Sequence, residues 1–270
     1  IVFNDVSYTF LEKFEEYLTK KAGKNENGLT HNTVVKYTKN FKSFLRWAER
    51  SGFNRNLEFY KYRIEAEIEP EVIALELDEL RNLMNVQLET ECLNQVRDIF
   101  IFGCFTGQRF SEVINLKPNH ILGNVWSNRS FKTRKARAIH VPLNSNALEI
   151  LKKYEGQPSG YCLPRITNQN MNKYLKTVGE QAELFNNVTI YRFKGGQMFE
   201  QVKMKYEVLT THIMRKTFVE NALGFGLKRD DVKSITGHKS EKDFRRYESG
   251  KSRIKADEME SFAQNINLSA

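Results

Sequence analysis

The sequence predicts a mainly α-helical protein of two domains, a small helical N-terminal domain and a larger mixed α/β domain in which helices carry a little antiparallel sheet. Three observations predict this fold class. Apolar residues recur at helical spacing over most of the chain, two stretches alternate in the manner of β-hairpins, and the segment RIEAEIEPEV (63–72) is acidic and contains one of the chain's five prolines. Because such a change in composition marks linkers, we place the domains at 1–67 and 68–270.

The first domain is predicted to contain two amphipathic helices. Within residues 5–22 the apolar positions that share a face are Val6, Phe10, Leu11, Phe14 and Leu18. The polar cluster GKNENG (23–28) ends this helix, and a second helix begins with Thr30 or Asn32 as its N-cap. Before Gly52 ends the second helix, its apolar face carries Val34, Tyr37, Phe41, Leu45 and Ala48.

A basic stripe runs along a neighbouring flank of the second helix. Four cations recur there at steps of three and four residues: Lys36, Lys39, Lys42 and Arg46. A solvated charged face is the usual interpretation of such a pattern, but the stripe has no acidic neighbour along the helix until Glu49. These four residues are therefore also candidates for contact with nucleic-acid phosphates.

The second domain begins with predicted helices at 77–85 and 93–105, followed by SEVINL (111–116) in helical rhythm. Residues 123–143 mix β-branched and aromatic residues around a polar tip at 133–135, which predicts a hairpin or a small three-stranded sheet. After a helix at 144–154, residues 188–204 predict a second hairpin around a Gly-Gly turn. Helices dominate from Thr211 onward, and residues 255–266 carry an apolar stripe.

Composition narrows the classes of function. Lys and Arg (42) outnumber Asp and Glu (33), and the resulting formal charge of +9 favours a polyanionic partner such as nucleic acid. Three cysteines, Cys92, Cys104 and Cys162, fit no metal-ligand spacing and predict no disulfide framework, which is typical of a reducing cytoplasm. No apolar run is long enough to span a membrane, and the lack of an initiator Met indicates a fragment.

Four polar clusters in the second domain could carry chemistry: TGQRFSEV around Arg109, SFKTRKAR around Lys132, THIMRKTF around His212 and Arg215, and GHKSEKDFRRY with His238 and Tyr247. Lys132 follows Arg109 by 23 residues, and Tyr247 follows His238 by nine. In this order and at these separations they resemble the tyrosine recombinase (phage integrase) family. That family has an arginine after T-G-x, a hairpin lysine, H-x-x-R, a histidine or tryptophan after glycine and a tyrosine nine residues later.

The resemblance covers nearly the whole chain and implies the tyrosine recombinase fold, in which a helical core-type DNA-binding domain precedes a catalytic domain. The hairpin before H-x-x-R is similar to that of integrases from Bacteroides-type mobile elements. Two positions depart from the family pattern: Gln108 stands where Leu is more frequent, and Lys216 stands where His is frequent. Neither departure removes a charge that the site needs.

The residue types suit cleavage of a phosphodiester by a hydroxyl. Negative charge develops on two non-bridging oxygens, and Arg109 and Arg215 can supply planar, permanent cations for them. Because a tyrosine hydroxyl needs cations and a proton acceptor to attack, Tyr247 is the candidate nucleophile and His212 the candidate acceptor. The resemblance implies that a hairpin lysine protonates the departing 5′-oxygen and that His238 hydrogen-bonds the phosphate. The intermediate would be a 3′-phosphotyrosine, resealed without metal, cofactor or ATP.

Taken singly, each residue has a plainer interpretation. His212 could pack or cap a helix, Arg109 could pair with Glu112, and Tyr247 is one of eleven tyrosines, so only the shared spacing favours catalysis. The histidines lack the spacing of a zinc site, and we expect no metal.

The hairpin lysine is open between two residues. Lys132 matches the usual start of the hairpin turn, but Lys135 is an alternative because a slip of one residue reverses the face that a strand side chain occupies.

The resemblance also implies partners and a compartment. It implies a site-specific recombinase or integrase of a mobile element that acts on double-stranded DNA. It also implies a homotetramer on DNA, joined through the C-terminal tail (255–266), and allows an accessory DNA-bending protein as a further partner. It implies no membrane association and a cytoplasmic, nucleoid-associated location in a bacterium. Two alternatives stay open: a type IB topoisomerase that relaxes DNA by the same tyrosine chemistry, and a DNA-binding protein without catalysis.

Overall fold

The computed structural model describes residues 2–23, 27–68, 73–128 and 138–248. Backbone contacts divide the chain into two compact units, Ile1–Pro70 with Thr189–Val202, and Glu71–Val188 with Lys203–Ala270. With a boundary after residue 67, the whole hairpin at 188–204 belongs to the second domain, whereas these contacts group most of it with the first unit. Two predictions lie outside the described residues: the hairpin lysine, whether Lys132 or Lys135, and the tail helix at 255–266.

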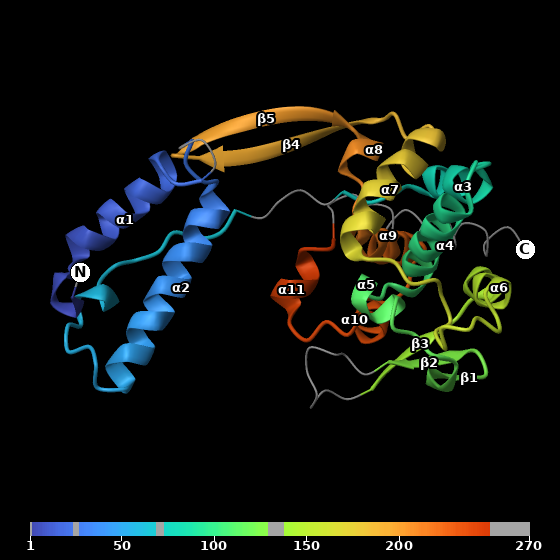
Figure 1. Cartoon of the computed structure of the whole chain (residues 1–270), viewed down its shortest axis with the longest axis horizontal. Helices are drawn as coiled ribbons and strands as arrows, with labels where there is room; N and C mark the ends of the chain where they lie inside the picture. The colour runs from blue at the N-terminus through green and yellow to red at the C-terminus, as the bar shows by residue number, and fades with distance from the viewer. Residues whose placement is uncertain (1, 24–26, 69–72, 129–137, 249–270) are drawn as a thin grey trace, which may run out of the picture. The chain divides into compact units, whose positions relative to one another are not determined.

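The first unit is built on two helices, α1 (Tyr8–Lys20) and α2 (His31–Arg50), as the sequence predicts (Figure 1). α1 begins where the Ser7 hydroxyl accepts the backbone N–H of Phe10 at 3.1 Å. Thr30 is the N-cap of α2. The apolar core between the helices and the following chain consists of Val6, Leu11, Leu45, Phe59 and Tyr62.

The buried face of α2 includes Val35 and Thr38, which were not predicted, and it differs most clearly from the prediction at Tyr37 and Lys42. Tyr37, predicted to face the core, is 51% exposed. Lys42, predicted to lie on the exposed basic stripe, is 5% exposed, and its ammonium group donates to the backbone carbonyl of Tyr62. A lysine stem can cover apolar surface when its charged end finds an acceptor, and charge alone therefore misplaced this residue.

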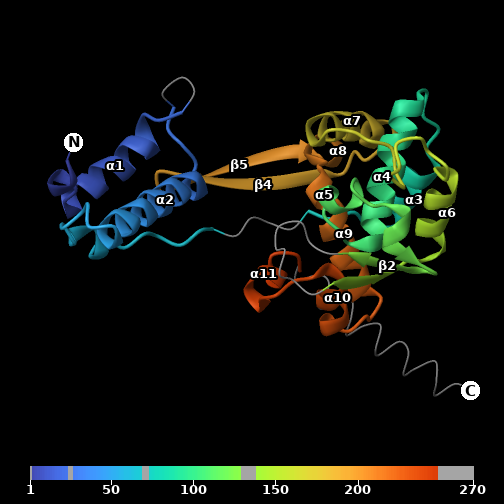
Figure 2. The same cartoon turned by 60° about the horizontal axis from the view of Figure 1, so that its bottom comes forward.

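The second unit is mainly helical, as predicted. Its helices are α3 (Leu77–Asn85), α4 (Glu91–Thr106), α5 (Phe110–Val113), α6 (Ser145–Lys153), α7 (Asn168–Gln181), α8 (Lys205–Val208), α9 (Thr211–Gly224), α10 (Arg229–Thr236) and α11 (Glu241–Arg245). α4 is central, because it contacts α3, α5, α6, α7 and α9 and buries apolar side chains around much of its circumference (Figures 1 and 2). No helix in the described part of the chain has the length and apolar character needed to cross a membrane.

Both predicted sheets are present. The first has the order β1 (Ile121–Leu122), β2 (Val125–Asn128), β3 (Ile139–Pro142), with antiparallel pairing that places Trp126 opposite Val141. Its strand β3 packs against α10. The second is the hairpin of β4 (Asn187–Lys194) and β5 (Gln197–Met204), whose turn residues Gly195 and Gly196 have φ of 56° and 76°. Positive φ at both turn residues is what a two-residue turn between twisted strands requires.

Two glycines end helices immediately before candidate site residues. Gly107 ends α4 with φ of 65°, and Gly237 ends α10 with φ of 68°. Each is also packed too closely for a side chain, because an added Cβ would lie 2.4 Å from the Phe218 ring at Gly107 and 2.2 Å from Ile139 at Gly237. The backbone that carries Arg109 and His238 is therefore fixed by both torsion and packing.

Replacing Gly107 by Ala should lower the free energy of unfolding by about 2 to 4 kcal/mol, because the left-handed torsion and the overlap with Phe218 both become unfavourable. Gly123→Ala is the matched control, since Gly123 has φ of 58° but nothing within 4 Å of an added Cβ. The control should lose only about 1 to 2 kcal/mol. Urea denaturation measures both, and equal losses would contradict the packing argument.

Candidate active site

Four segments of the second unit bring polar side chains together. They are the turn between α4 and α5 with Arg109, the first two turns of α9 with His212 and Arg215, the turn after α10 with His238, and the turn after α11 with Tyr247. α9 lies close to α4 because Gly103 has no side chain, and a Cβ there would lie 2.4 Å from the sulfur of Met214. This approach places Arg215 beside the end of α4.

Arg215 lies at the centre of the cluster and is 1% exposed. Its Nη1 donates to the carbonyl of Gly107 at 2.9 Å, and its Nη2 donates to the carbonyl of Thr236. Both carbonyls belong to helix C-termini, where acceptors lack partners within the helix. Burial, and then the charge of Arg109, lower the pKa of Arg215 to about 10, so the guanidinium remains cationic at neutral pH.

His238 lies against the same guanidinium. Nη2 of Arg215 is 3.2 Å from Nε2 and 3.4 Å from Nδ1 of the imidazole, and the hydroxyl of Thr236 is 2.7 Å from Nδ1. Burial, followed by the charges of Arg215 and Arg109, lowers the pKa of His238 to about 3. The imidazole is therefore neutral at physiological pH, which avoids burying a second charge beside the first.

The ring of Tyr247 packs on three groups of the cluster. Its centroid lies 4.6 Å from that of His238 and 5.3 Å from that of His212, and Cζ of Arg215 is 5.5 Å from it. Tyr247 is half-buried and borders a small apolar core in which Phe244 is fully buried. A tyrosine in a mainly polar stretch thus has its packing partners on other segments.

Arg109 pairs with Glu112 and also lies near the cluster. It is the N-cap of α5, its backbone N–H donates to Glu112 at 2.9 Å, and its guanidinium lies 3.4 Å from the same carboxylate. The plainer interpretation, an ion pair with Glu112, is therefore correct as far as it goes. However, the Arg109 side chain is 34% exposed, and its charge acts on both Arg215 and His238. One cation can pair with Glu112 and still face the cluster.

Gln108 connects the Arg109 turn to the end of α10. Its side chain is fully buried, and its amide donates to the carbonyls of Ile235 at 2.7 Å and Thr106 at 3.1 Å. A leucine at this position could not make these bonds. The departure from the family pattern therefore adds a polar link between two segments of the site.

An ionic network holds the segment that carries Tyr247. Arg229, in α10, pairs with Glu241 at the start of α11 and with Glu248, the residue after Tyr247. The Glu248 side chain is 3% exposed, and Cζ of Arg229 also lies 5.1 Å from the Phe244 ring. The two carboxylates bracket the tyrosine in sequence, so one cation fixes both ends of its segment.

Five residues predicted from sequence lie together in this cluster: Arg109, His212, Arg215, His238 and Tyr247. Sequence reasoning missed the polar residues that hold them, chiefly Thr236, Gln108 and Arg229. Gln108 could have been found as an amide at a position where the family more often has an apolar residue. Thr236 and Arg229 give no signal in the sequence, because their contacts depend on how α10 lies against α9 and α11.

The candidate DNA-binding residues on α2 divide into two groups. Lys36, Lys39 and Arg46 are exposed, whereas Lys42 is buried and cannot belong to a phosphate-binding stripe. Lys39 nevertheless has an acidic partner outside the helix, since its ammonium group lies 2.6 Å from the carboxylate of Glu67. The segment after α2 supplies this carboxylate, and no spacing rule along a single helix could reveal it.

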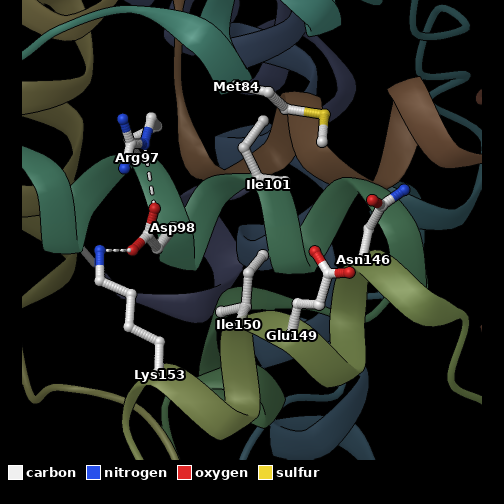
Figure 3. A pocket seen from close by; sticks show the side chains of 8 residues that line it. All are labelled: Met84, Arg97, Asp98, Ile101, Asn146, Glu149, Ile150 and Lys153. Atoms are coloured by element: carbon white, nitrogen blue, oxygen red, sulfur yellow. Dashed lines mark hydrogen bonds and ion pairs between the residues drawn. The ribbon is translucent and has the colours of Figure 1, made fainter.

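A pocket of about 190 Å³ lies among α3, α4 and α6 (Figure 3). Its residues are Met84, Arg97, Asp98, Ile101, Asn146, Glu149, Ile150 and Lys153. Asp98 accepts from Arg97 and Lys153, as the dashed lines in Figure 3 show, and from the hydroxyl of Tyr154. The carboxylate is paired with two cations and a hydroxyl, and the pocket is below the size usual for ligands, so we assign it a structural role between α4 and α6.

Comparisons with known proteins agree with this arrangement. Two family models match, the phage integrase SAM-like domain over residues 1–64 and the phage integrase family over residues 74–252. A lambda integrase dimer bound to a COC′ core site matches 91% of this chain and 80% of its own, with a TM-score of 0.64 and 13% identity. No curated protein sequence matches the chain significantly.

Two further solved structures are similar. The Tn1549 transposon integrase in complex with a circular intermediate DNA matches 95% of this chain and 85% of its own, with a TM-score of 0.62 and 14% identity. The XerH site-specific recombinase bound to a palindromic difH substrate matches 96% and 72%, with a TM-score of 0.60 and 14% identity. At these identities the similarity shows the fold alone.

The fold and the matched catalytic region define the class of protein, a DNA breaking-rejoining enzyme of the tyrosine recombinase type. The chain belongs to the phage integrase family, whose model covers well over half of its residues.

Replacing Arg229 by Gln should lower the free energy of unfolding by roughly 3 kcal/mol, because Glu248 would remain buried without its cation. Arg81→Gln is the matched control, since it breaks an exposed ion pair: the Arg81 side chain is 69% exposed and that of its partner Asp78 is 87% exposed. The control should lose less than about 1 kcal/mol. Denaturant unfolding of both variants measures the difference, and a loss at Arg229 no larger than at Arg81 would mean that the network does not hold the Tyr247 segment.

Proposed function

We propose that this chain is a site-specific DNA recombinase, the integrase of a mobile element, that cleaves and rejoins DNA through a 3′-phosphotyrosine intermediate. The observation that carries the proposal is the packing of the Tyr247 ring against Arg215, His212 and His238. His212 and Arg215 come from α9 and His238 from the turn after α10, and these two segments have no structural need to share one tyrosine. A nucleophile, a cation and two imidazoles are the groups that attack on a phosphodiester requires.

Arg215 and Arg109 would bind the scissile phosphate. Nε of Arg215 is buried and makes no hydrogen bond within the described residues, so one donor of the guanidinium lacks an acceptor there. Burial of such a donor is unfavourable unless an acceptor reaches it, and a phosphate oxygen is a suitable acceptor. Arg109, which is partly exposed, would bind a second oxygen and neutralise charge as the pentavalent transition state forms.

The proposed reaction moves two protons, one away from the nucleophile and one onto the leaving group. The Tyr247 oxygen attacks phosphorus while its proton passes to His212, and the bond from phosphorus to the 5′-oxygen breaks. The departing oxygen takes a proton from Lys132, whose position lies outside the described residues. The 3′-phosphotyrosine keeps the energy of one phosphodiester, so a second 5′-hydroxyl can attack it and reseal the strand without ATP. Since two guanidiniums supply the positive charge, the chemistry requires no metal ion.

Double-stranded DNA is the proposed substrate. The net charge of +9 and the exposed cations Lys36, Lys39 and Arg46 support it, as do the DNA complexes of the similar lambda, Tn1549 and XerH proteins. A tetramer joined through the C-terminal tail and a location with the bacterial nucleoid complete the proposal. Both rest on the family resemblance. The tail itself lies outside the described residues.

Incubation of the protein with a nicked suicide substrate should give a covalent protein–DNA adduct, and Tyr247→Phe should abolish it because the attacking oxygen is gone. Tyr17→Phe is the control: Tyr17 is 55% exposed in α1, and its variant should form the adduct at the parental rate. A parent protein that binds DNA but gives no adduct would support a binding protein without catalysis. Adduct formation with plasmid relaxation, but without recombination of paired sites, would favour the topoisomerase alternative.

The affinity for core-site DNA should fall steeply with salt, and each α2 cation that contacts a phosphate should account for about 0.9 of the slope of log K against log salt. Lys36→Gln and Arg46→Gln should each reduce the slope by that amount. Lys20→Gln, which removes an exposed cation of α1 paired with Glu16, should not change it. Fluorescence anisotropy at several salt concentrations measures the slopes, and equal slopes for all three variants would exclude α2 as a phosphate-binding helix.

A further inference from the structure

Thr236 contacts two members of the proposed active site at once. It is the last residue of α10, it is fully buried, and its carbonyl accepts from Nη2 of Arg215. Its hydroxyl lies 2.7 Å from Nδ1 of His238. One residue therefore contacts both the guanidinium, through its carbonyl, and the imidazole, through its hydroxyl. The direction of the hydrogen bond between the hydroxyl and Nδ1 determines which ring nitrogen of His238 carries the proton.

The proton of the Thr236 hydroxyl has two possible acceptors at short range, the carbonyl of Val232 and Nδ1 of His238. Oγ1 lies 2.6 Å from the carbonyl oxygen of Val232 and 3.4 Å from that of Lys233. A carbonyl oxygen can only accept, and two oxygens approach to 2.6 Å only when a proton lies between them. The hydroxyl proton therefore points to Val232, and Oγ1 presents lone pairs to His238.

This direction fixes the tautomer of His238. Nδ1 faces a lone pair of Thr236 and must carry the proton, so Nε2 of the neutral ring carries a lone pair. Nη2 of Arg215 lies 3.2 Å from Nε2 and 3.4 Å from Nδ1, so this donor contacts both ring nitrogens and is compatible with a lone pair on Nε2. The charges of Arg215, Arg109 and Lys233, together with the nearby His212, all oppose protonation of the ring, in keeping with its low pKa.

We propose that Thr236 is a positioning residue that fixes the Nδ1–H tautomer of His238, so that His238 donates to a DNA phosphate only after Nε2 has taken up one proton from solvent. The tautomer of His238 does not depend on the proposed function, whereas the donation to a DNA phosphate rests on it. With the neutral ring, the lone pair of Nε2 lies 3.2 Å from Nη2 of Arg215. When a phosphate oxygen approaches, its negative charge favours the imidazolium, which donates from Nε2 while Nδ1–H remains on Thr236.

The tautomer can be measured without DNA. In the full chain labelled with ¹⁵N-histidine, two-bond ¹⁵N–¹H spectra at pH 7 distinguish protonated from unprotonated ring nitrogens, and His238→Asn identifies the signal among the five histidines. We expect a protonated Nδ1 and an unprotonated Nε2. A protonated Nε2, or an imidazolium, would overturn the proposal.

Two variants separate positioning from structure. Thr236→Val keeps the shape but removes the acceptor of Nδ1–H, and it should mix the two tautomers and slow adduct formation on the suicide substrate about 10-fold, the cost of one hydrogen bond. Thr236→Ser keeps the hydroxyl and should restore both the parental spectrum and most of the rate. A valine variant that folds and keeps the parental tautomer would overturn the role of Thr236; should it not fold, the parent and serine spectra still decide.

The proton uptake gives a separate readout. Because the protonated ring is the form that donates to phosphate, the ratio of the parent rate of adduct formation to that of His238→Asn at subsaturating DNA should fall as pH rises, since the His212 base acts equally in both proteins. A ratio that does not change or that rises with pH would overturn the uptake step. Absence of any adduct in the parent would instead reject the proposed function and leave the tautomer measurement intact.

Discussion

The buried guanidinium of Arg215 is the interaction on which the rest of the second unit's site depends. A permanent cation that is 1% exposed is stable only when acceptors surround it, and the carbonyls of Gly107 and Thr236 provide them from the ends of α4 and α10. Each carbonyl lies within two residues of a candidate site residue, Arg109 or His238. The hydrogen bonds that make the burial of Arg215 tolerable therefore also bring the site together.

The surrounding residues reinforce this centre in different ways. Gly107 and Gly237 supply left-handed torsions and close packing where no side chain fits. Gln108 joins the ends of α4 and α10 through two backbone carbonyls, and Arg229 ties the Tyr247 segment to α10. These contacts are local and polar, whereas the helices themselves are held by the apolar contacts around α4. Packing thus fixes the framework, and a few buried polar groups fix the orientation of the reactive side chains.

Most of the fold and the main members of the site could be predicted from sequence. Helical and hairpin periodicities are local, so α3, the three-stranded sheet and the Gly195-Gly196 hairpin follow from their own segments. The spacing of Arg109, H-x-x-R, His238 and Tyr247 identified a set that no single residue could justify. The predictions that failed also have physical causes. Lys42 is buried because the carbonyl of Tyr62 accepts its charge, and Thr236 matters through a carbonyl and a hydroxyl that meet α9 only in three dimensions.

The central claim is that the cluster around Arg215 presents Tyr247, and no other tyrosine, to a DNA phosphorus. Mass spectrometry of the adduct after nuclease and trypsin digestion tests this most directly, because trypsin should release Tyr247 in the peptide YESGK, residues 247–251. The account predicts a nucleotide remnant joined through its 3′-phosphate to that peptide. A remnant on a peptide with a different tyrosine, or one joined through a 5′-phosphate, would contradict it.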